Sequence, residues 1–178
     1  MSLAMIDVHD LLGHPGLARS YDLLGTIDDL ATELVAVPDD ALLGGGLALE
    51  SVIEGVFVTG SITGTWRVRC ARCLTEQTQP FTVEVAELVT TTPLEPADAD
   101  DDGYVLVDEQ LDVDQIVRDA VGVEMPFAPL CRPDCQGLCP TCGGNRNLGE
   151  CPGHDAIDPR FAVLSDLLLE LPTTDDPA

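Results

Sequence analysis

The chain has 178 residues, of which 45% are apolar and 4% aromatic, and its 8 basic and 32 acidic residues give a net charge of −24 at pH 7. This length fits one domain of ordinary size, or one domain with a small satellite, with a core built from Leu, Val, Ile and Ala. So much negative charge repels phosphate backbones, which counts against a general nucleic-acid-binding protein, and it attracts basic partners.

The sequence predicts neither a membrane span nor a secretory signal. It contains no uninterrupted apolar run of about 18 residues, and residues 1–16 have neither a basic region nor an apolar run. We therefore expect a cytoplasmic protein. Thiols stay reduced in the cytoplasm, so clustered cysteines indicate metal or redox chemistry there and not disulfide staples.

Residues 1–130 are predicted to form an α+β core, in which an antiparallel β meander packs with a few helices. Residues 7–45 have mixed character, with a possible short helix at 28–34 and a loop that includes Gly44, Gly45 and Gly46. Residues 47–92 alternate and are rich in β-branched side chains, which predicts at least three antiparallel strands.

The second half of the chain is predicted to contain two helices separated by a cysteine-rich segment. An acidic loop at 93–103 and a short strand at 104–107 come first. A helix should follow and stop near 122–126, because one of its faces carries Leu111, Ile116, Val117, Ala120 and Val121.

Residues 131–157 are predicted to form a zinc-binding segment. Asp158 and Pro159 have the residue types of an N-cap and a first helical position, which predicts a C-terminal helix over 158–171. We expect the tail at 172–178 to be disordered.

Cysteine spacing is the most informative feature of the sequence. Cys70 and Cys73 form one C-x2-C motif, Cys139 and Cys142 form another, and Cys151-Pro-Gly-His154 has the same gap. Two intervening residues let one tight turn direct both ligands at the same ion.

Eight candidate ligands therefore divide into two sets of four, which predicts one or two structural zinc ions. The local set consists of Cys139, Cys142, Cys151 and His154, and the long-range set of Cys70, Cys73, Cys131 and Cys135. A dithiol redox pair at Cys70 and Cys73 and an iron–sulfur cluster remain as alternatives. A disulfide framework would suit a secreted chain, which we do not expect here.

All eight basic residues are arginines, and five of them lie in or beside the cysteine motifs: Arg67, Arg69, Arg72, Arg132 and Arg146. Their guanidinium groups could offset the negative charge of zinc–thiolate centres, which is the interpretation that we prefer. Alternatively, Arg67, Arg69 and Arg72 form a small patch that contacts phosphate or RNA.

Two further patterns carry less weight. Residues Asp98 to Glu109 match the calcium loop of an EF-hand, but the preceding segment contains two prolines where a helix would be needed, so we interpret them as a solvated acidic loop. His9, His14 and Ser20 could suggest catalysis, but no orienting acid is placed beside them by the sequence, and we expect surface or capping roles.

With these residues in view, the chain resembles the YceD family, the large ribosomal RNA subunit accumulation proteins. The resemblance covers residues 20–171 and rests mainly on CRPDCQGLCPTCGGNRN from Cys131 and on DPRFAVL from Asp158. Cys70-Ala-Arg-Cys73-Leu74, the acidic loop with Tyr104, and the stretch from Pro126 to Leu130 accompany these motifs. Family members with the longer motif usually end it with C-x-C, so His154 as a ligand is inferred from this sequence alone.

The resemblance implies a non-enzymatic role in the accumulation of large-subunit (23S) ribosomal RNA. It also implies that the long-range ligand set is the one that family members share. Because a charge of −24 is unsuited to gripping RNA, we expect contact with a basic ribosomal protein or an assembly intermediate, and indirect contact with ribosomal RNA. The alternatives are a zinc-dependent nucleic-acid-binding regulator and a dithiol oxidoreductase.

Overall fold

The structure is a computed structural model, and it describes residues 3, 5–92 and 103–154. The chain divides into two units, Met1–Cys135 and Gln136–Ala178, which are treated separately below. The predictions for residues 93–102 of the acidic loop, for a helix at 158–171 and for a tail at 172–178 lie outside the described residues.

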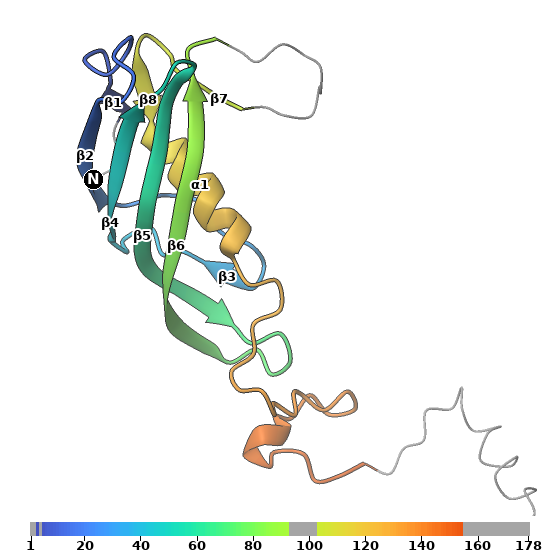
Figure 1. Cartoon of the computed structure of the whole chain (residues 1–178). Coiled ribbons are helices and arrows are strands. Elements are labelled where there is room, and N and C mark those ends of the chain that lie inside the picture. The colour runs from blue at the N-terminus through green and yellow to red at the C-terminus, as the bar shows by residue number, and fades with distance from the viewer. Residues whose placement is uncertain (1–2, 4, 93–102, 155–178) are drawn as a thin grey trace, which may run out of the picture. The chain divides into compact units, whose positions relative to one another are not determined.

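The first unit contains a mainly antiparallel sheet (Figure 1). Its strands run in the order β2 (Ala18–Gly25), β4 (Leu43–Ser51), β5 (Gly55–Arg69), β6 (Glu76–Thr90) and β7 (Tyr104–Val105), and β3 (Val35–Ala36) pairs with the far end of β5. All neighbouring strands are antiparallel except β6 and β7, which are parallel. The meander predicted over residues 47–92 is confirmed as β4, β5 and β6.

A two-stranded sheet and a helix complete the first unit. β1 (Met5–Asp7) pairs with β8 (Gln110–Asp112), and α1 (Val113–Glu124) follows β8 directly. The Asp112 carboxylate accepts a hydrogen bond of 3.1 Å from the Gln115 backbone N–H and so caps α1. The amphipathic helix that the sequence predicts here is confirmed over Val113–Glu124, and its buried face is Val113, Ile116, Val117 and Val121. Of the predicted face, Leu111 lies in β8 instead, because the strand continues to Asp112, and Ala120 is partly buried.

The expectation of a few helices is too high for the described residues, where α1 is the single α-helix and η1 (Arg146–Leu148) is a short 3-10 turn. Neither has the length and apolar character that crossing a bilayer requires.

Two local predictions are wrong. Residues 28–34 are not helical, because Ala31 bridges to Ala36 and the Val37 N–H donates to the Leu30 carbonyl, so the segment folds back on β3. The glycines at 44–46 are not a loop but part of β4. A Cβ atom at Gly45 would collide with the Ser61 carbonyl oxygen of β5, so the close approach of these strands requires glycine there.

Candidate metal centres

The structure brings the cysteines and His154 into two groups, each with four ligand atoms within 4.8 Å of one another. The hairpin cluster consists of Cys70, Cys73, Cys131 and Cys135 and lies wholly in the first unit. The knuckle cluster consists of Cys139, Cys142, Cys151 and His154 and lies wholly in the second. These are the two sets that the spacing predicts, and their occupancy by zinc stays a prediction.

The tip of the long β5–β6 hairpin positions the first half of the hairpin cluster. The Leu74 N–H donates to the Cys70 carbonyl at 2.9 Å, and the Cys70 N–H donates to the Thr75 carbonyl at 3.0 Å. Leu74 takes a left-handed conformation with φ of 58°, which closes the turn. The Arg72 N–H lies 3.5 Å from the Cys70 sulfur. This turn aims both sulfur atoms at one point and directs a backbone donor to one of them.

Residues 126–135 supply the second half of the hairpin cluster and have no regular secondary structure. Three hydrogen bonds join them to the hairpin tip. The Ala71 N–H donates to the Pro129 carbonyl at 2.8 Å, Gln77 Nε2 to the Leu130 carbonyl at 3.3 Å, and Arg72 Nη1 to the Cys135 carbonyl at 3.0 Å. The cluster therefore joins segments that are about 60 residues apart in the sequence.

The sulfur separations in the hairpin cluster suit a tetrahedral ion. Cys70 and Cys135 sulfurs are 3.7 Å apart, and Cys73 and Cys131 sulfurs are 3.5 Å apart. A tetrahedron with zinc–sulfur distances of about 2.3 Å has sulfur–sulfur edges of about 3.8 Å, whereas a disulfide bond is about 2.05 Å long. All seven cysteines are free. This donor set matches a zinc site with four cysteine ligands, and an iron–sulfur centre would use the same thiolates.

The pKa values of the hairpin cluster are split in the metal-free protein. Burial acts to raise the pKa of Cys70, but hydrogen bonds from backbone amides, including that of Arg72, outweigh it and lower the pKa to about 6. Thr75 lowers the pKa of Cys73, and its Oγ1 lies 3.2 Å from the sulfur. Hydrogen bonding with Cys73, together with burial, raises the pKa of Cys131 to about 12. Four adjacent thiols cannot all ionise without a cation, which a divalent metal would supply.

The knuckle cluster is held by a tight turn of its own. The Gly143 N–H donates to the Cys139 carbonyl at 2.8 Å, and the Cys139 N–H donates to the Gly144 carbonyl at 2.9 Å. A Cβ atom at Gly144 would lie 3.0 Å from the Glu150 carbonyl oxygen and 3.4 Å from the Cys142 sulfur, so a side chain there would crowd the cluster. Backbone hydrogen bonds from Cys142 and Thr141 lower the pKa of Cys139 to about 6.

The two clusters differ in exposure. Cys70, Cys73 and Cys135 of the hairpin cluster are buried, whereas Cys142 and His154 of the knuckle cluster are exposed. Each group offers four ligand atoms from the protein, which would complete a tetrahedral site and leave no open coordination position for a reacting water. The arrangement suits structural metal binding.

The arginines near the hairpin cluster are largely engaged with the protein itself. Arg69 forms an ion pair of 3.0 Å with Glu76, Arg72 donates to the Cys135 carbonyl, and Arg132 lies 3.4 Å from Asp134. Arg67 is exposed and lines a hollow together with Asp29, Asp39 and Asp40. Contact of Arg67, Arg69 and Arg72 with RNA or phosphate stays a prediction, and acidic residues lie near Arg67 and Arg69.

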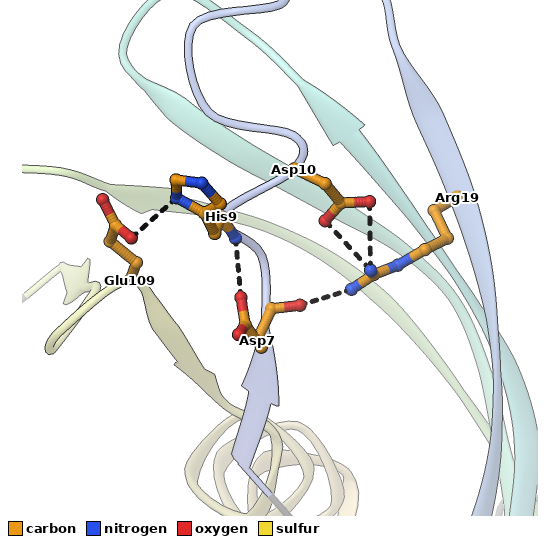
Figure 2. A network of polar contacts seen from close by, with 5 residues as sticks. All are labelled: Asp7, His9, Asp10, Arg19 and Glu109. Carbon is orange, nitrogen blue, oxygen red and sulfur yellow. Dashed lines mark hydrogen bonds and ion pairs between the residues drawn. The ribbon is translucent and has the colours of Figure 1, made fainter.

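The histidines and the end of the EF-hand-like pattern lie at the surface. Figure 2 shows the contact between His9 and Glu109, and Arg19 beside Asp10. The His9 Nδ1 atom lies 2.9 Å from a Glu109 carboxylate oxygen. His14 Nδ1 lies 3.1 Å from the Leu12 carbonyl oxygen. Residues 98–102 of that pattern lie outside the described residues.

Sequence reasoning missed Thr75, whose hydroxyl contacts the Cys73 sulfur, and the Pro129 carbonyl that receives the Ala71 N–H. A polar residue two positions after a C-x2-C motif is a usable indication of a ligand-supporting contact. The Pro129 contact has no local indication in the sequence.

A sequence model described as "Large ribosomal RNA subunit accumulation protein YceD" matches residues 58–168. The chain belongs to the YceD family. The match includes all eight residues of the two clusters.

The chain is also similar to individual proteins, one of which, from a plant, carries the family's name. The chain is 41% identical over 169 residues to the uncharacterized protein Rv2926c of Mycobacterium tuberculosis, covering 92% of this chain and 80% of the relative. It is 25% identical to the chloroplastic "Large ribosomal RNA subunit accumulation protein YCED homolog 1" of Zea mays, covering 82% of this chain and 59% of the relative. It is 27% identical to the uncharacterized protein YlbN of Bacillus subtilis, covering 61% of this chain and 63% of the relative. No solved structure matches the chain.

Proposed function

We propose that this YceD-family chain is a non-enzymatic, zinc-binding factor that supports accumulation of large-subunit (23S) ribosomal RNA. The observation that carries the proposal is the convergence of four cysteine sulfurs within 4.8 Å at the hairpin tip, in a chain of this family. The plant relative is named for the same role.

Zinc is the ion that suits both ligand sets. Four thiolates, or three thiolates and one imidazole, in a tetrahedral arrangement are typical of structural zinc sites. When bound, zinc would link the hairpin tip to residues 131–135 and would close the turn between Cys139 and His154. The protein's own residues do the rest, since Thr75 and the backbone N–H of Arg72 support the sulfurs.

A dithiol oxidoreductase using Cys70 and Cys73 is supported by one observation, the lowered pKa of Cys70. Its geometry is unfavourable, because the exposed fraction of Cys70 is 0% and that of Cys73 is 6%. A redox-active thiolate must meet the sulfur of its substrate, and such cysteines are partly exposed. The structural interpretation of Cys70 and Cys73 is therefore the better supported one.

The net charge of −24 favours a basic ribosomal protein or an assembly intermediate as the direct partner. Engagement of Arg69 and Arg72 within the protein weakens the case for a zinc-dependent nucleic-acid-binding regulator.

Depletion in the host tests the role directly. We expect the ratio of large- to small-subunit ribosomal RNA to fall, and to be restored by the wild-type chain but not by a Cys70→Ser/Cys131→Ser variant. Ser20→Ala, which alters an exposed strand position away from both clusters, is the matched control and should restore the ratio. An unchanged ratio after depletion would overturn the proposed role. Elemental analysis of protein purified without chelator should give two zinc ions per chain. A zinc content of zero would overturn the metal assignment.

A further inference from the structure

The first unit has a groove that the metal clusters do not explain. A hollow of about 420 Å³ opens between β7, β8 and the start of α1. Met5, Val105 and Val107 line it and are 45%, 37% and 62% exposed. In a chain whose surface is so highly charged, three exposed apolar side chains around one hollow indicate a binding surface.

Two carboxylates line the same groove, and each has an oxygen left for a ligand. Asp119 Oδ2 accepts hydrogen bonds from the Tyr104 hydroxyl at 2.9 Å and from Gln115 Nε2 at 2.8 Å. Asp112 uses Oδ1 to cap α1. Among the described residues, the second oxygen of each carboxylate has no hydrogen-bonding partner. These internal hydrogen bonds fix where the two charges lie, without neutralising them.

The basic residue of α1 does not pair with the carboxylates of Asp112 and Asp119 in this groove. Arg118 is the one basic residue of α1, and it forms an ion pair of 3.1 Å with Asp114 and donates to the Asp28 carbonyl at 2.8 Å. Burial and the hydrogen bond to Asp119 hold the pKa of Tyr104 well above its usual range, and the charges of Asp119 and Glu87 act in the same direction.

The wall of the groove is held in place by contacts of the turn at Asp108 and Glu109, one of which, between His9 and Glu109, is drawn in Figure 2. Asp108 and Glu109 both take left-handed conformations, with φ of 53° and 61°, in the turn that pairs Val107 with Gln110. The Glu109 carbonyl accepts from the Val8 N–H at 3.0 Å, and its carboxylate contacts His9. The turn is therefore tied to β1, which carries Met5, and the groove is preformed.

We propose that this groove receives an arginine- or lysine-bearing segment of a basic partner protein. The cationic end of the side chain would lie between Asp112 and Asp119, and its aliphatic stem and neighbouring apolar residues would pack on Met5, Val105 and Val107. Charge complementarity with a chain of net charge −24 selects this class of partner. The inference rests on the proposed function in one respect, that the partner is basic, and it names the surface that such a partner contacts.

Titration of the full-length zinc-loaded protein with a defined peptide tests the inference. The probe is a capped decapeptide with four arginines and two leucines, and the matched probe has citrulline in place of each arginine. We expect the arginine peptide to shift the NMR signals of residues 103–107 and 110–119, and the citrulline peptide to bind at least about tenfold more weakly. Absence of these shifts, or concentration-dependent shifts there without peptide, would overturn the proposal, because another part of the chain or a second copy would then occupy the groove.

Isosteric variants separate groove binding from general attraction to an acidic protein. Asp112→Asn/Asp119→Asn removes two charges but keeps the helix cap and the acceptor for Tyr104. Glu50→Gln/Glu84→Gln removes the same charge from exposed strand positions of β4 and β6. We expect about five- to thirtyfold weaker peptide binding for the first variant and less than about twofold for the second.

Equal losses of peptide affinity in these two double variants would overturn the proposal that the groove binds the peptide. The proposed function fails separately, if depletion of the protein leaves the ratio of ribosomal RNAs unchanged, whatever the peptide does. Val107→Ser, compared with Ile53→Ser at another exposed apolar position, tests the apolar wall, and equal peptide affinity in these two variants would also count against the proposal.

Discussion

Loss of the metal from the hairpin cluster should release residues 126–135 while the sheet stays folded. Ordering these ten residues costs about 10–20 kcal/mol of backbone conformational entropy. Their three hydrogen bonds to the hairpin tip offset about 3 kcal/mol of this cost. The remainder is of the order of the 10–16 kcal/mol that structural zinc supplies in small domains. The hydrogen bonds alone therefore cannot hold the segment in place.

The apolar core should survive this change, because it ends at Met125 and includes no residue of the 126–135 segment. A Cys131→Ser variant should bind one zinc ion fewer and keep the far-ultraviolet circular dichroism of the wild type. The Ala71 amide, which donates to the Pro129 carbonyl, should lose protection from hydrogen exchange by at least about a hundredfold.

Cys142→Ser is the matched control, since it removes one ligand of the knuckle cluster instead. It should also cost one zinc ion but leave the protection of the Ala71 amide unchanged. Wild-type protection of Ala71 in the Cys131→Ser variant would show that hydrogen bonds and packing suffice at the hairpin tip, and the reasoning above would be refuted.

Three further outcomes are expected. Zinc affinity should rise from pH 6 to pH 8, because zinc binding displaces protons from thiols such as Cys131. Hydrogen bonding with Cys73, together with burial, raises the pKa of Cys131 to about 12, so this thiol is protonated at both pH values. A chelator competition that gives the same zinc affinity at pH 6 and pH 8 would contradict this. A chelator should remove zinc from the knuckle cluster first, because Cys142 and His154 are exposed, and stopped-flow chelation of the single-cluster variants should show the order of loss. Gly45→Ala should lower the free energy of unfolding, measured by urea denaturation, by at least about 2 kcal/mol, because the new Cβ atom collides with the β5 backbone. Gly46→Ala is the control: no atom lies within 4 Å of its Cβ position, and the free energy of unfolding should change by less than about 1 kcal/mol.

The elements with strong periodicity could be predicted from the sequence. Alternation in β5 and β6 and the apolar face of α1 are local patterns, and the structure confirms both. β2 was missed because it lies at the edge of the sheet and Leu23 is its one buried large side chain, so its alternation is weak. The glycines of β4 were assigned to a loop because glycine is rare in strands, and only the approach of β5 explains them.

Three ligand pairs, Cys70/Cys73, Cys139/Cys142 and Cys151/His154, could be predicted because two residues between ligands are a local geometric requirement. Cys131 and Cys135 are separated by three residues, and the sequence joins them to Cys70 and Cys73 only as the donors that remain. The contacts that support the ligands could not be predicted, because they join residues far apart in the sequence. Arg72 contacts the Cys135 carbonyl across 63 residues, and Gln77 contacts the Leu130 carbonyl across 53. The groove between β7, β8 and α1 could not be predicted for the same reason. In the sequence, Asp119 is typical of an exposed helix position and Asp112 of a helix cap, and neither indicates a binding surface.

Position along β6 separates the two features that we assign to the first unit. The hairpin cluster lies beside the start of this 15-residue strand, at Glu76, and the groove includes Val89 near its end. Figure 1 shows the hairpin tip and β7 at opposite ends of β6. At about 3.3 Å per residue, about 40 Å of strand lies between them, well beyond the range over which substitutions usually couple. Cys131→Ser should therefore leave peptide affinity at the groove unchanged while it lowers zinc content. A large loss of peptide affinity in that variant would mean that the metal orders the whole sheet and not just its tip.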